Sequence, residues 1–430
     1  MAGHDAQASR IAQLGSWSSR SDQERQEIAD DLIDSFSRPE ALNDASMIQL
    51  LAEGLASSGQ IWKWPENLSP CTDVPSTGGV GSLTTLLCPY ILAASGCFVP
   101  KVSVPGGTAG GIDVLSLLPG FRTQLNHSDM ISVLSKARIA HSANSDSLAP
   151  ADGYLFKRRK ERNRVGVTPL AVASLLSKKL VVGCKATGMD IRMGIAGNFG
   201  ADLRTCQQNA HLFVRVAQLL NIRTSCVIND ISGPPIPQIG RLESLLLLWT
   251  VLTNRDSDLS ISDHVQTCIT IAGEGLVAGG VTNDHKKAYD LAAQSVRTGA
   301  AKDTFLSHIR EQGAAPDAVD QVLRKLDNAQ RLPLTSRTRG FLSEIDTRRL
   351  SLWLRQFNGD LGDSVGIHVK SRCGMEIREN AVLAEIRVSD ALHITPSMIE
   401  ELGGAFSITE TEPLGRTGPI VDVIRSFAEQ

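Results

Sequence analysis

The sequence predicts an α/β protein, in which a small helical N-terminal lobe precedes a large α/β lobe and a C-terminal α+β subdomain. Helical periodicity runs through the first sixty residues, short apolar runs then alternate with helical stretches, and the character of the chain changes again from Leu332. With 430 residues, the chain has room for two or three domains.

The N-terminal lobe is predicted from two amphipathic stretches. A capping-box arrangement at 21–24 predicts the start of a helix whose apolar side carries Ile28, Leu32, Ile33 and Phe36. A second helix is expected over 44–55, with an inward face made by Met47, Leu50, Leu51 and Leu55. The segment 62–67, Trp-Lys-Trp-Pro-Glu-Asn, interrupts the pattern and predicts a linker or hinge.

Beyond the linker the predicted elements become shorter and alternate. Helices are expected over 84–95, 168–179, 265–273, 286–299 and 301–312. Strands buried on both faces are expected over 97–104, 181–182, 186–193, 224–228 and 243–252. Two further strands, over 340–345 and 381–388, predict the compact C-terminal unit.

Composition and charge describe an ordinary soluble globular protein. Hydrophobic residues make up 42% of the chain and charged residues 21%, and the net charge is -3, so nothing requires a nucleic-acid or membrane partner. The longest apolar stretches fall well short of the ~20 residues that span a bilayer, and the N-terminus lacks the features of a signal peptide. We therefore expect a cytoplasmic protein. The eight cysteines show no metal-ligand spacing, which predicts reduced thiols and no metal site.

Two glycine-rich turns are the most informative feature of the chain. Ser-Thr-Gly-Gly-Val-Gly at 76–81 and Gly-Gly-Thr-Ala-Gly-Gly at 106–111 each carry hydroxyl groups and abut an apolar segment. Glycine lets a backbone bring several N–H groups close to an oxyanion, because it accepts positive φ and has no Cβ. Either turn alone is equally consistent with an ordinary strand-to-helix connection. Together they favour a site for a phosphate, a carboxylate or a sugar.

Six motifs follow one another along the chain. They are STGGVG at 76–81, SLAPAD at 147–152, LFKRR at 155–159, ASLLSKKL at 173–180, DIRMG at 190–194 and FLSEIDTR at 341–348. In this order and at these spacings they resemble the pyrimidine-nucleoside phosphorylase family, which includes thymidine phosphorylase. The resemblance extends from about residue 45 to residue 425.

The resemblance implies a homodimer whose subunit has a small all-helical lobe and a large α/β lobe facing each other across a cleft. The helical lobe would comprise residues 1–64 and 151–181, bind the base and form the dimer contact. The α/β lobe would comprise residues 68–150 and 182–330 and bind phosphate, and residues 331–430 would form the C-terminal subdomain. The predicted linker lies where a hinge would close the two lobes.

The base-binding residues of the family carry over onto Arg159, Ser174 and Lys178 with matching spacing. Ser174 and Lys178 stand one turn apart on a predicted helix, so the hydroxyl and the ammonium face one ligand. Cleavage of an N-glycosidic bond leaves negative charge on the departing pyrimidine, which a guanidinium and an ammonium stabilise. We therefore expect Arg159 and Lys178 to act in catalysis. The alternative is that both are solvated helix charges.

The phosphate-binding residues carry over less completely. The expected set is Ser76, Gly79, Gly81, Thr85, Ser103, Thr108 and Gly110. Where the family has a lysine and a histidine before the first loop, this chain has Val74 and Pro75. The second loop is about one residue shorter than in the family, so that Ile112 falls at the position of a threonine for which Thr108 would substitute. A charge-assisted contact contributes about 1.5–3 kcal/mol, so phosphate is expected to bind more weakly than in the family.

The segment 157–164 contains six cations in eight residues and is more basic than the same stretch of the family. It would receive an anionic substituent such as a 5′-phosphate, or it is a solvated basic loop. Aromatic residues do not interleave it, so we expect no nucleic-acid partner. The motif at 190–194 is expected to end a core strand in a structural role.

The sequence thus predicts a pentosyltransferase that cleaves a pyrimidine nucleoside by attack of phosphate at C1′, without a metal or organic cofactor. Two alternatives stay open. One is an enzyme with another acceptor, including water, or with an unusual nucleoside or nucleotide substrate. The other is a non-catalytic pyrimidine-binding paralogue.

Overall fold

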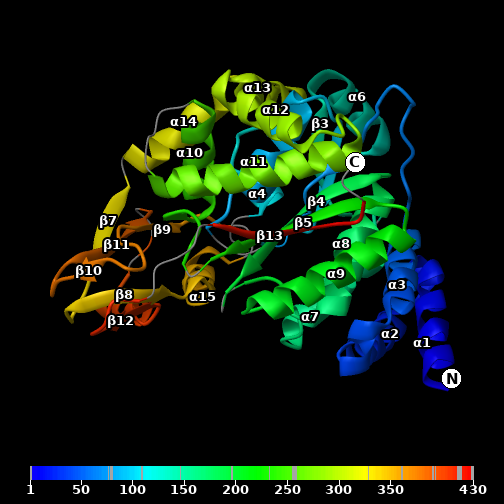
Figure 1. The fold of residues 1–430 in the computed structure, drawn as a ribbon, viewed down its shortest axis with the longest axis horizontal. Coiled ribbons are helices and arrows are strands. Elements are labelled where there is room, and N and C mark those ends of the chain that lie inside the picture. Colours follow the sequence, from blue (N-terminus) through cyan, green and yellow to red (C-terminus); the bar gives the residue numbers. More distant parts are fainter. Residues whose placement is uncertain are drawn as a thin grey trace.

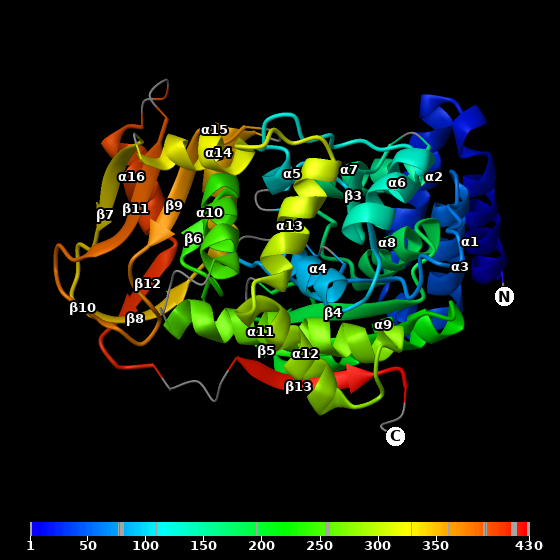
Figure 2. The same ribbon diagram turned by 90° about the horizontal axis from the view of Figure 1, so that it is seen from above.

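The computed structural model of the protein describes residues 2–427 apart from 76, 78–80, 108–109, 146, 195–196, 232, 254–258, 328, 360–361, 390–391, 393 and 414–418. A central sheet lies between two layers of helices, the N-terminal helices gather at one end, and a β-rich unit lies at the other (Figure 1). The view from above shows the same order along the molecule (Figure 2). This architecture confirms the predicted α/β class.

The first sixty residues form the expected helices. They are α1 (Ala2–Ala12), the 3-10 turns η1 (Gln13–Ser19) and η2 (Pro39–Asn43), α2 (Asp22–Phe36) and α3 (Ala45–Ser57). The predicted capping box is confirmed: the Ser21 amide donates to Glu24 Oε2 at 2.8 Å, and the Glu24 amide donates to Ser21 Oγ at 3.3 Å. One expectation is wrong, because Leu50 is 42% exposed. Leu50 lies beside the buried face of α3, to which the fully buried Ile48 and Leu51 belong.

Two later helices pack onto this N-terminal group. They are α7 (Pro150–Glu161), which contacts α2, and α8 (Thr168–Val181), which contacts α3. The helix predicted over 168–179 is therefore confirmed as α8. The apolar side chains of α2, α3, α7 and α8 share one core with helix α9 (Leu203–Leu219).

The central sheet is parallel apart from one edge strand. Its strands are β1 (Thr72–Asp73), β4 (Ala186–Met193), β5 (Arg223–Asp230) and the antiparallel β13 (Ile420–Arg425), in this order. A parallel pair, β2 (Val99–Ser103) and β3 (Ile139–Ala143), continues from β1 through a parallel bridge between Cys71 and Phe98. Burial along β2 and β4 confirms the prediction of strands covered on both faces.

Helices cover both faces of this sheet. Helix α9 lies on the face that carries the N-terminal helices, and α11 (Leu259–Gly279) crosses the opposite face (Figure 1). A second core surrounds α11 and six further helices, which are α4 (Thr84–Ala94), α5 (Gly111–Leu115), α10 (Arg241–Leu252), α12 (His285–Arg297), α13 (Ala300–Glu311) and α14 (Ala318–Asp327). Helix α6 (His127–Ala137) belongs to a smaller core that it shares with Trp62, Phe98 and the end of α8. The helices predicted at 84–95, 265–273, 286–299 and 301–312 are thus confirmed.

Two predicted strands are wrong. Residues 243–252 form most of α10, and residues 181–182 lie at the end of α8. Most of the side chains in α10 are buried, so its sequence shows neither the 3.6-residue period of an amphipathic helix nor the two-residue period of a half-buried strand. It is rich in leucine, which favours helix, and contains a single valine.

The C-terminal unit contains two antiparallel sheets. One holds β6 (Gln238–Ile239), β9 (Val365–Val369), β11 (Val382–Val388) and β7 (Gln330–Thr335), and the other holds β10 (Glu376–Ile377), β8 (Gly340–Ile345) and β12 (Phe406–Thr409). Helices α15 (Thr347–Asn358) and α16 (Pro396–Gly403) complete it. The predicted strands at 340–345 and 381–388 are confirmed as β8 and β11. After β12 the chain leaves this unit, and β13 pairs with β5 of the central sheet.

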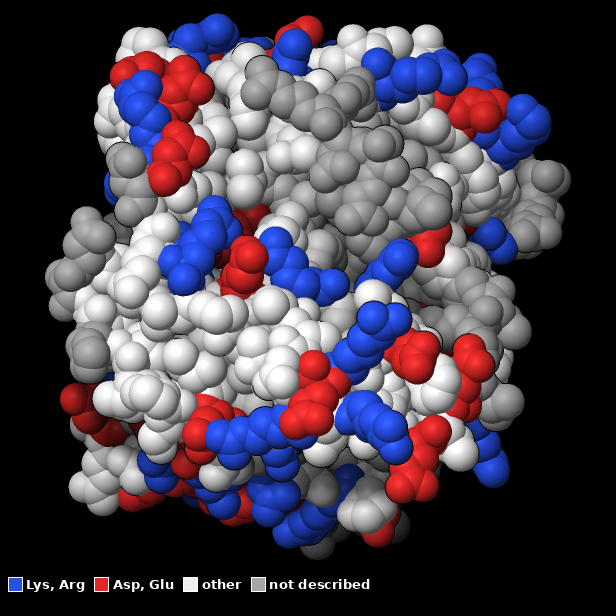
Figure 3. All heavy atoms as spheres, turned by 90° about the vertical axis from the view of Figure 1, so that its left-hand side faces the viewer, with Lys and Arg blue, Asp and Glu red and all other residues white. Residues whose placement is uncertain are grey.

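A buried ion pair connects the C-terminal unit with α10. Arg387 of β11 donates to both carboxylate oxygens of Glu243, and to Asp363 Oδ2 at 3.0 Å. On the outer face of this unit, positive and negative side chains are interspersed (Figure 3). That face therefore carries no extended field of one sign.

Candidate active site

The two glycine-rich loops begin at the same edge of the central sheet. Strand β1 ends at Asp73 and strand β2 ends at Ser103, and the two strands are parallel neighbours. Ligands of open α/β sheets bind outside the carboxyl ends of the strands. Of the residues predicted to bind phosphate, three lie outside the described residues, namely Ser76, Gly79 and Thr108. The other four are placed at this edge, namely Gly81, Thr85, Ser103 and Gly110.

The described part of the first loop is held by charged residues of β4. Arg192 donates to Thr77 Oγ1 at 2.7 Å, and its partner carboxylate Asp190 accepts from Thr84 Oγ1 at 2.9 Å. Asn229 donates to the second oxygen of Asp190 at 2.7 Å. The motif at 190–194 thus brings a buried guanidinium to the loop. Sequence reasoning assigned it a structural role only, although its place among the ordered motifs was a signal.

Thr85 and Ser103 both lie close to His141 and Gly111, beside the second loop. The Thr85 hydroxyl is buried and has no hydrogen-bond partner among the described residues. A Cβ on Gly111 would lie 3.4 Å from that hydroxyl and 3.0 Å from His141 Cε1. Ser103 Oγ shares a hydrogen bond of 2.8 Å with His141 Nε2, and burial lowers the pKa of His141 well below its ordinary value. A buried hydroxyl without a partner is rare, and a bound ligand would satisfy it.

The second loop closes on a carboxylate of its own. Asp113 accepts from the amide of Gly106 at 2.8 Å and from that of Gly107 at 3.0 Å, while Arg241 donates to the Gly107 carbonyl at 2.9 Å. A Cβ on Gly110 would lie 2.4 Å from Asp113 Oδ2. Burial raises the pKa of Asp113, although the two amides and Arg241 oppose this. The two amides are therefore already occupied by an anion of the protein.

The predicted base-binding pair lies on α8 and is joined by a carboxylate from α7. Lys178 Nζ donates to Ser174 Oγ at 2.9 Å, to the Ser174 carbonyl at 2.7 Å and to Asp152 Oδ2 at 2.5 Å. Asp152 is 2% exposed, and its Oδ1 has no partner among the described residues. Burial lowers the pKa of Lys178, and the charges of Lys179 and Arg159 act in the same direction, against the attraction of Asp152. Sequence reasoning missed Asp152, although it ends the SLAPAD motif.

Arg159 points into the connection between α7 and α8. Its guanidinium donates to the carbonyls of Arg164, Val165 and Leu170, and the residue is 2% exposed. Burial lowers the pKa of Arg159 to about 10. In this conformation the arginine closes the loop, and its charge reaches the Ser174–Lys178 pair only through space.

Part of the basic segment 157–164 serves the helical packing. Arg158 binds both oxygens of Asp30 at 2.8 and 2.9 Å, and Arg162 donates to Asp34 at 2.7 Å. Both carboxylates lie on α2, so these two cations hold α7 against the N-terminal helices. They are not available for a 5′-phosphate without breaking these pairs.

Helices α7 and α8 both reach the edge of the sheet where the glycine-rich loops begin. A Cβ on Gly153 of α7 would lie 2.5 Å from Asn144 Nδ2, and the Asn144 amide donates to the Ser103 carbonyl at 2.9 Å. Lys179 of α8 donates to Asp73 Oδ2 at the end of β1. The elements that carry the predicted base-binding and phosphate-binding residues therefore border one region of the molecule.

The predicted hinge at 62–67 is fastened at several points. The Trp62 amide donates to the Val181 carbonyl at 2.8 Å, and Trp64 Nε1 donates to the Val182 carbonyl at 2.6 Å. His127 stacks on Trp62 with ring centroids 5.5 Å apart. The linker thus follows the end of α8.

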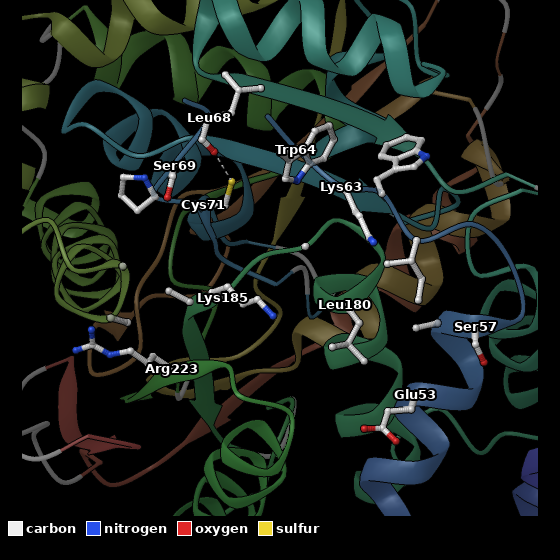
Figure 4. A pocket seen from close by; sticks show the side chains of 18 of the residues that line it. Glu53, Ser57, Lys63, Trp64, Leu68, Ser69, Cys71, Leu180, Lys185 and Arg223 are labelled. Atoms are coloured by element: carbon white, nitrogen blue, oxygen red, sulfur yellow. Dashed lines mark hydrogen bonds between the residues drawn. The ribbon is translucent and has the colours of Figure 1, made fainter. Parts of the chain in front are cut away.

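Two cavities lie outside this region. The larger, of about 1110 Å³, is bounded by α3, the linker and the edges of β4 and β5, and Lys63 and Lys185 extend into it from different sides (Figure 4). The smaller, of about 580 Å³, lies between the end of β5 and the C-terminal unit, next to Asp230 and His368. Neither is lined by a residue predicted to bind base or phosphate.

The described residues also bear on metal, thiol and membrane chemistry. No group of three or more histidine, cysteine or acidic side chains there has the arrangement of a metal site. All eight cysteines are free thiols. Among the described helices, none is both long and apolar enough to cross a membrane.

Comparison with known proteins agrees with the resemblance seen in the motifs. Residues 68–194 match the family described as "Glycosyl transferase family, a/b domain". The chain is 26% identical to the thymidine phosphorylase of Sinorhizobium fredii over 376 residues, which cover 85% of each chain. It is 28% identical to the pyrimidine-nucleoside phosphorylase of Staphylococcus epidermidis over 328 residues, or 74% of each chain. The predicted resemblance is confirmed, and the chain is a glycosyltransferase-type enzyme.

Solved structures show the same fold at greater distance. The anthranilate phosphoribosyltransferase of Saccharomyces cerevisiae, in complex with PRPP and Mg, superimposes with a TM-score of 0.53. The two chains are 13% identical, and the match covers 72% of this chain and 92% of the other. The glycosyltransferase assignment therefore rests on the family match and the sequence relatives, and the structural neighbours support the fold.

Proposed function

We propose that this protein cleaves a pyrimidine nucleoside by phosphorolysis, releasing the free base and a pentose 1-phosphate. The observation that carries the proposal is the Ser174–Lys178–Asp152 group on helices that contact the ends of the strands before the two glycine-rich loops. The group brings the positive charge of a buried ammonium and the Ser174 hydroxyl to a planar polar ligand, and the loops offer an anion site. The names of the sequence relatives supply the reaction class.

On the base side, the departing group is an anion. The C1′–N bond breaks with its electron pair going to the pyrimidine, so negative charge grows on the ring nitrogen and the carbonyl oxygens. Lys178 stabilises that charge where it develops, and the buried setting strengthens the interaction. Arg159 stabilises the same negative charge at a distance, or contacts the base directly once its hydrogen bonds to the α7–α8 connection are broken.

On the sugar side, an oxygen of phosphate forms the new bond to C1′ on the opposite face. In the proposed reaction the Thr85 hydroxyl, which has no partner among the described residues, and the start of α4 hold that phosphate. Arg192 keeps the first loop in position through Thr77. Orientation of the two reactants supplies much of the rate, and no protein nucleophile is required.

A second candidate function follows from the second loop. Its Gly106 and Gly107 amides are occupied by Asp113, and the first loop has Val74 and Pro75 where the family carries charge. A weakened phosphate site would favour another acceptor, including water, or binding without turnover.

Release of free base from uridine and from thymidine, with and without phosphate, separates these functions. Phosphate-dependent release supports phosphorolysis. Release that is independent of phosphate supports the other acceptor, and tight binding of base without release under any acceptor supports the non-catalytic protein.

The protein is also proposed to form a homodimer through its helical lobe. Two apolar residues near the linker and α3 are unusually accessible, with Leu50 42% and Ile61 51% exposed. Light scattering coupled to gel filtration measures the mass, and Leu50→Glu is expected to give a monomer.

A further inference from the structure

Three buried charged residues meet at the base of the first glycine loop. Lys101 of β2 donates to Asp73 Oδ1 at 2.9 Å, and Lys179 of α8 donates to Asp73 Oδ2. The carboxylate is 0% exposed, and the two lysines are 1% and 2% exposed. We call this group the Asp73 cluster.

With both lysines protonated, the Asp73 cluster contains one more positive than negative charge, and burial lowers the pKa of Lys101 against the attraction of Asp73. The other titratable groups that sense Lys101 do not balance the excess charge, because burial raises the pKa of the Cys184 thiol well above its ordinary value and lowers that of His141 well below. Both are neutral near pH 7. Although burial opposes ionisation of Asp73, the two lysines hold its pKa below the ordinary value. A buried charge without a counter-charge is unfavourable in a folded protein.

The excess charge lies at the root of both loops. Lys101 Nζ also donates to the carbonyl of Val74, which stands directly before the first loop, at 2.5 Å. On β2, Ser103 follows two residues later on the same face, and the second loop starts there. The side chain of Val74 itself is fully buried in the core, so no cation of the loop occupies that position.

We infer that Lys101 supplies, from the core behind the loops, the positive charge that the first loop lacks at Val74 and Pro75. Phosphate bound in the loops then neutralises the excess charge of the Asp73 cluster. Lys101 is a positioning residue in this arrangement: it orients the start of the loop through the Val74 carbonyl, and its field favours an anion. The inference rests on the proposed phosphate site and names the residue that makes it cationic.

The burial of Lys101 also predicts how its replacement changes stability. Lys101→Met leaves Asp73 and Lys179 as a neutral pair, so the variant loses an uncompensated charge. A lysine with a purely structural role would destabilise the protein when replaced. The inference instead predicts an unfolding midpoint equal to or above that of the wild type in phosphate-free buffer.

The experiment measures binding of inorganic phosphate by titration calorimetry, the shift of the unfolding midpoint with phosphate, and the KM for each substrate. For Lys101→Met we expect phosphate Kd and KM to rise about tenfold, the phosphate-dependent midpoint shift to be lost and the nucleoside KM to stay within twofold. Lys136→Met is the matched control, because it removes an equal charge from an exposed site in α6, where Lys136 pairs with Glu311. It should behave like the wild type.

Lys179→Met removes the other lysine that pairs with Asp73. It provides a second test of the excess charge if Lys101→Met does not fold. It also leaves a neutral pair, and it should weaken phosphate binding to a similar degree. Unchanged phosphate Kd in the folded variants, while the wild type performs phosphorolysis, overturns this inference alone. A wild type that binds no phosphate overturns both the inference and the proposed phosphorolysis.

Discussion

Replacement of Lys178 by methionine tests the base side of the site most directly. The ammonium uses its three N–H groups on Asp152 Oδ2, Ser174 Oγ and the Ser174 carbonyl, at 2.5, 2.9 and 2.7 Å. The Lys178 side chain is 12% exposed and that of Asp152 is 2% exposed. Lys178→Met therefore removes the one described hydrogen-bond partner of a buried carboxylate as well as the cation proposed to stabilise the departing base.

Loss of the ion pair lowers stability and loss of the cation lowers turnover, and a second substitution restores only the first. Breaking a buried ion pair by removing one partner costs about 3–5 kcal/mol of stability. Removing one preorganised contact to a developing negative charge lowers kcat about 100- to 1000-fold. The second substitution Asp152→Asn removes the stranded charge, so the double variant should regain stability to within about 1 kcal/mol of the wild type. It should not regain turnover.

Urea unfolding followed by tryptophan fluorescence gives the stability of the wild type, the two single variants and the double variant. Base release at saturating nucleoside and phosphate gives kcat for the same four proteins. Asp152→Asn alone is the matched control, because it keeps the ammonium. If the double variant recovers both stability and turnover, Lys178 only neutralises Asp152, and its role in catalysis is refuted.

Three further predictions concern the loops and the core. Val74→Lys places an ammonium in the core beside Lys101, so the variant should lose roughly 3 kcal/mol or more of stability. Its KM for phosphate should not fall. A lower KM would show that position 74 faces the anion. Gly110→Ala puts a methyl group 2.4 Å from Asp113 Oδ2. The variant should have a phosphate KM about tenfold higher and a free energy of unfolding in urea about 1–3 kcal/mol lower. An unchanged KM would show that the second loop does not bind phosphate. Burial lowers the pKa of His308 to about 4 from an ordinary 6.5, so the unfolded chain binds more protons between these values and stability falls as the pH drops through them, by roughly 3 kcal/mol. His308→Gln should remove that part of the pH dependence of unfolding, and the same slope in the variant would contradict the assignment.

Several features of the fold could be predicted because they depend on near neighbours in the chain. The capping box at Ser21 and Glu24 and the helix over 168–179 are set by residues within one or two turns. Helical geometry alone places Ser174 and Lys178 on one face. The second glycine-rich loop follows the predicted strand over 97–104, whereas the strand before the first loop, β1, is the polar pair Thr72–Asp73 and was not predicted. The strand expected over 243–252 failed because a fully buried helix and a fully buried strand share one composition.

The candidate site depended on contacts between distant parts of the chain. The basic segment 157–164 looked free for a ligand, yet Arg158 is paired with Asp30, 128 residues away. In the second loop the partner is near in sequence, because Asp113 accepts from the amides of Gly106 and Gly107, yet the fold of the loop decides that contact. Neither partner could be chosen from the sequence, since many carboxylates are available.

The sequence by itself determined the α/β class, the family resemblance and the local pairing of Ser174 with Lys178, because patterns of a few residues carry that information. Only the tertiary structure decided which charges are neutralised. Asp73 meets Lys101 across 28 residues and Lys179 across 106, and the position where the family carries its loop cation is here a buried valine. The energy of a charge depends on its burial and its neighbours in space, and folding alone brings these together.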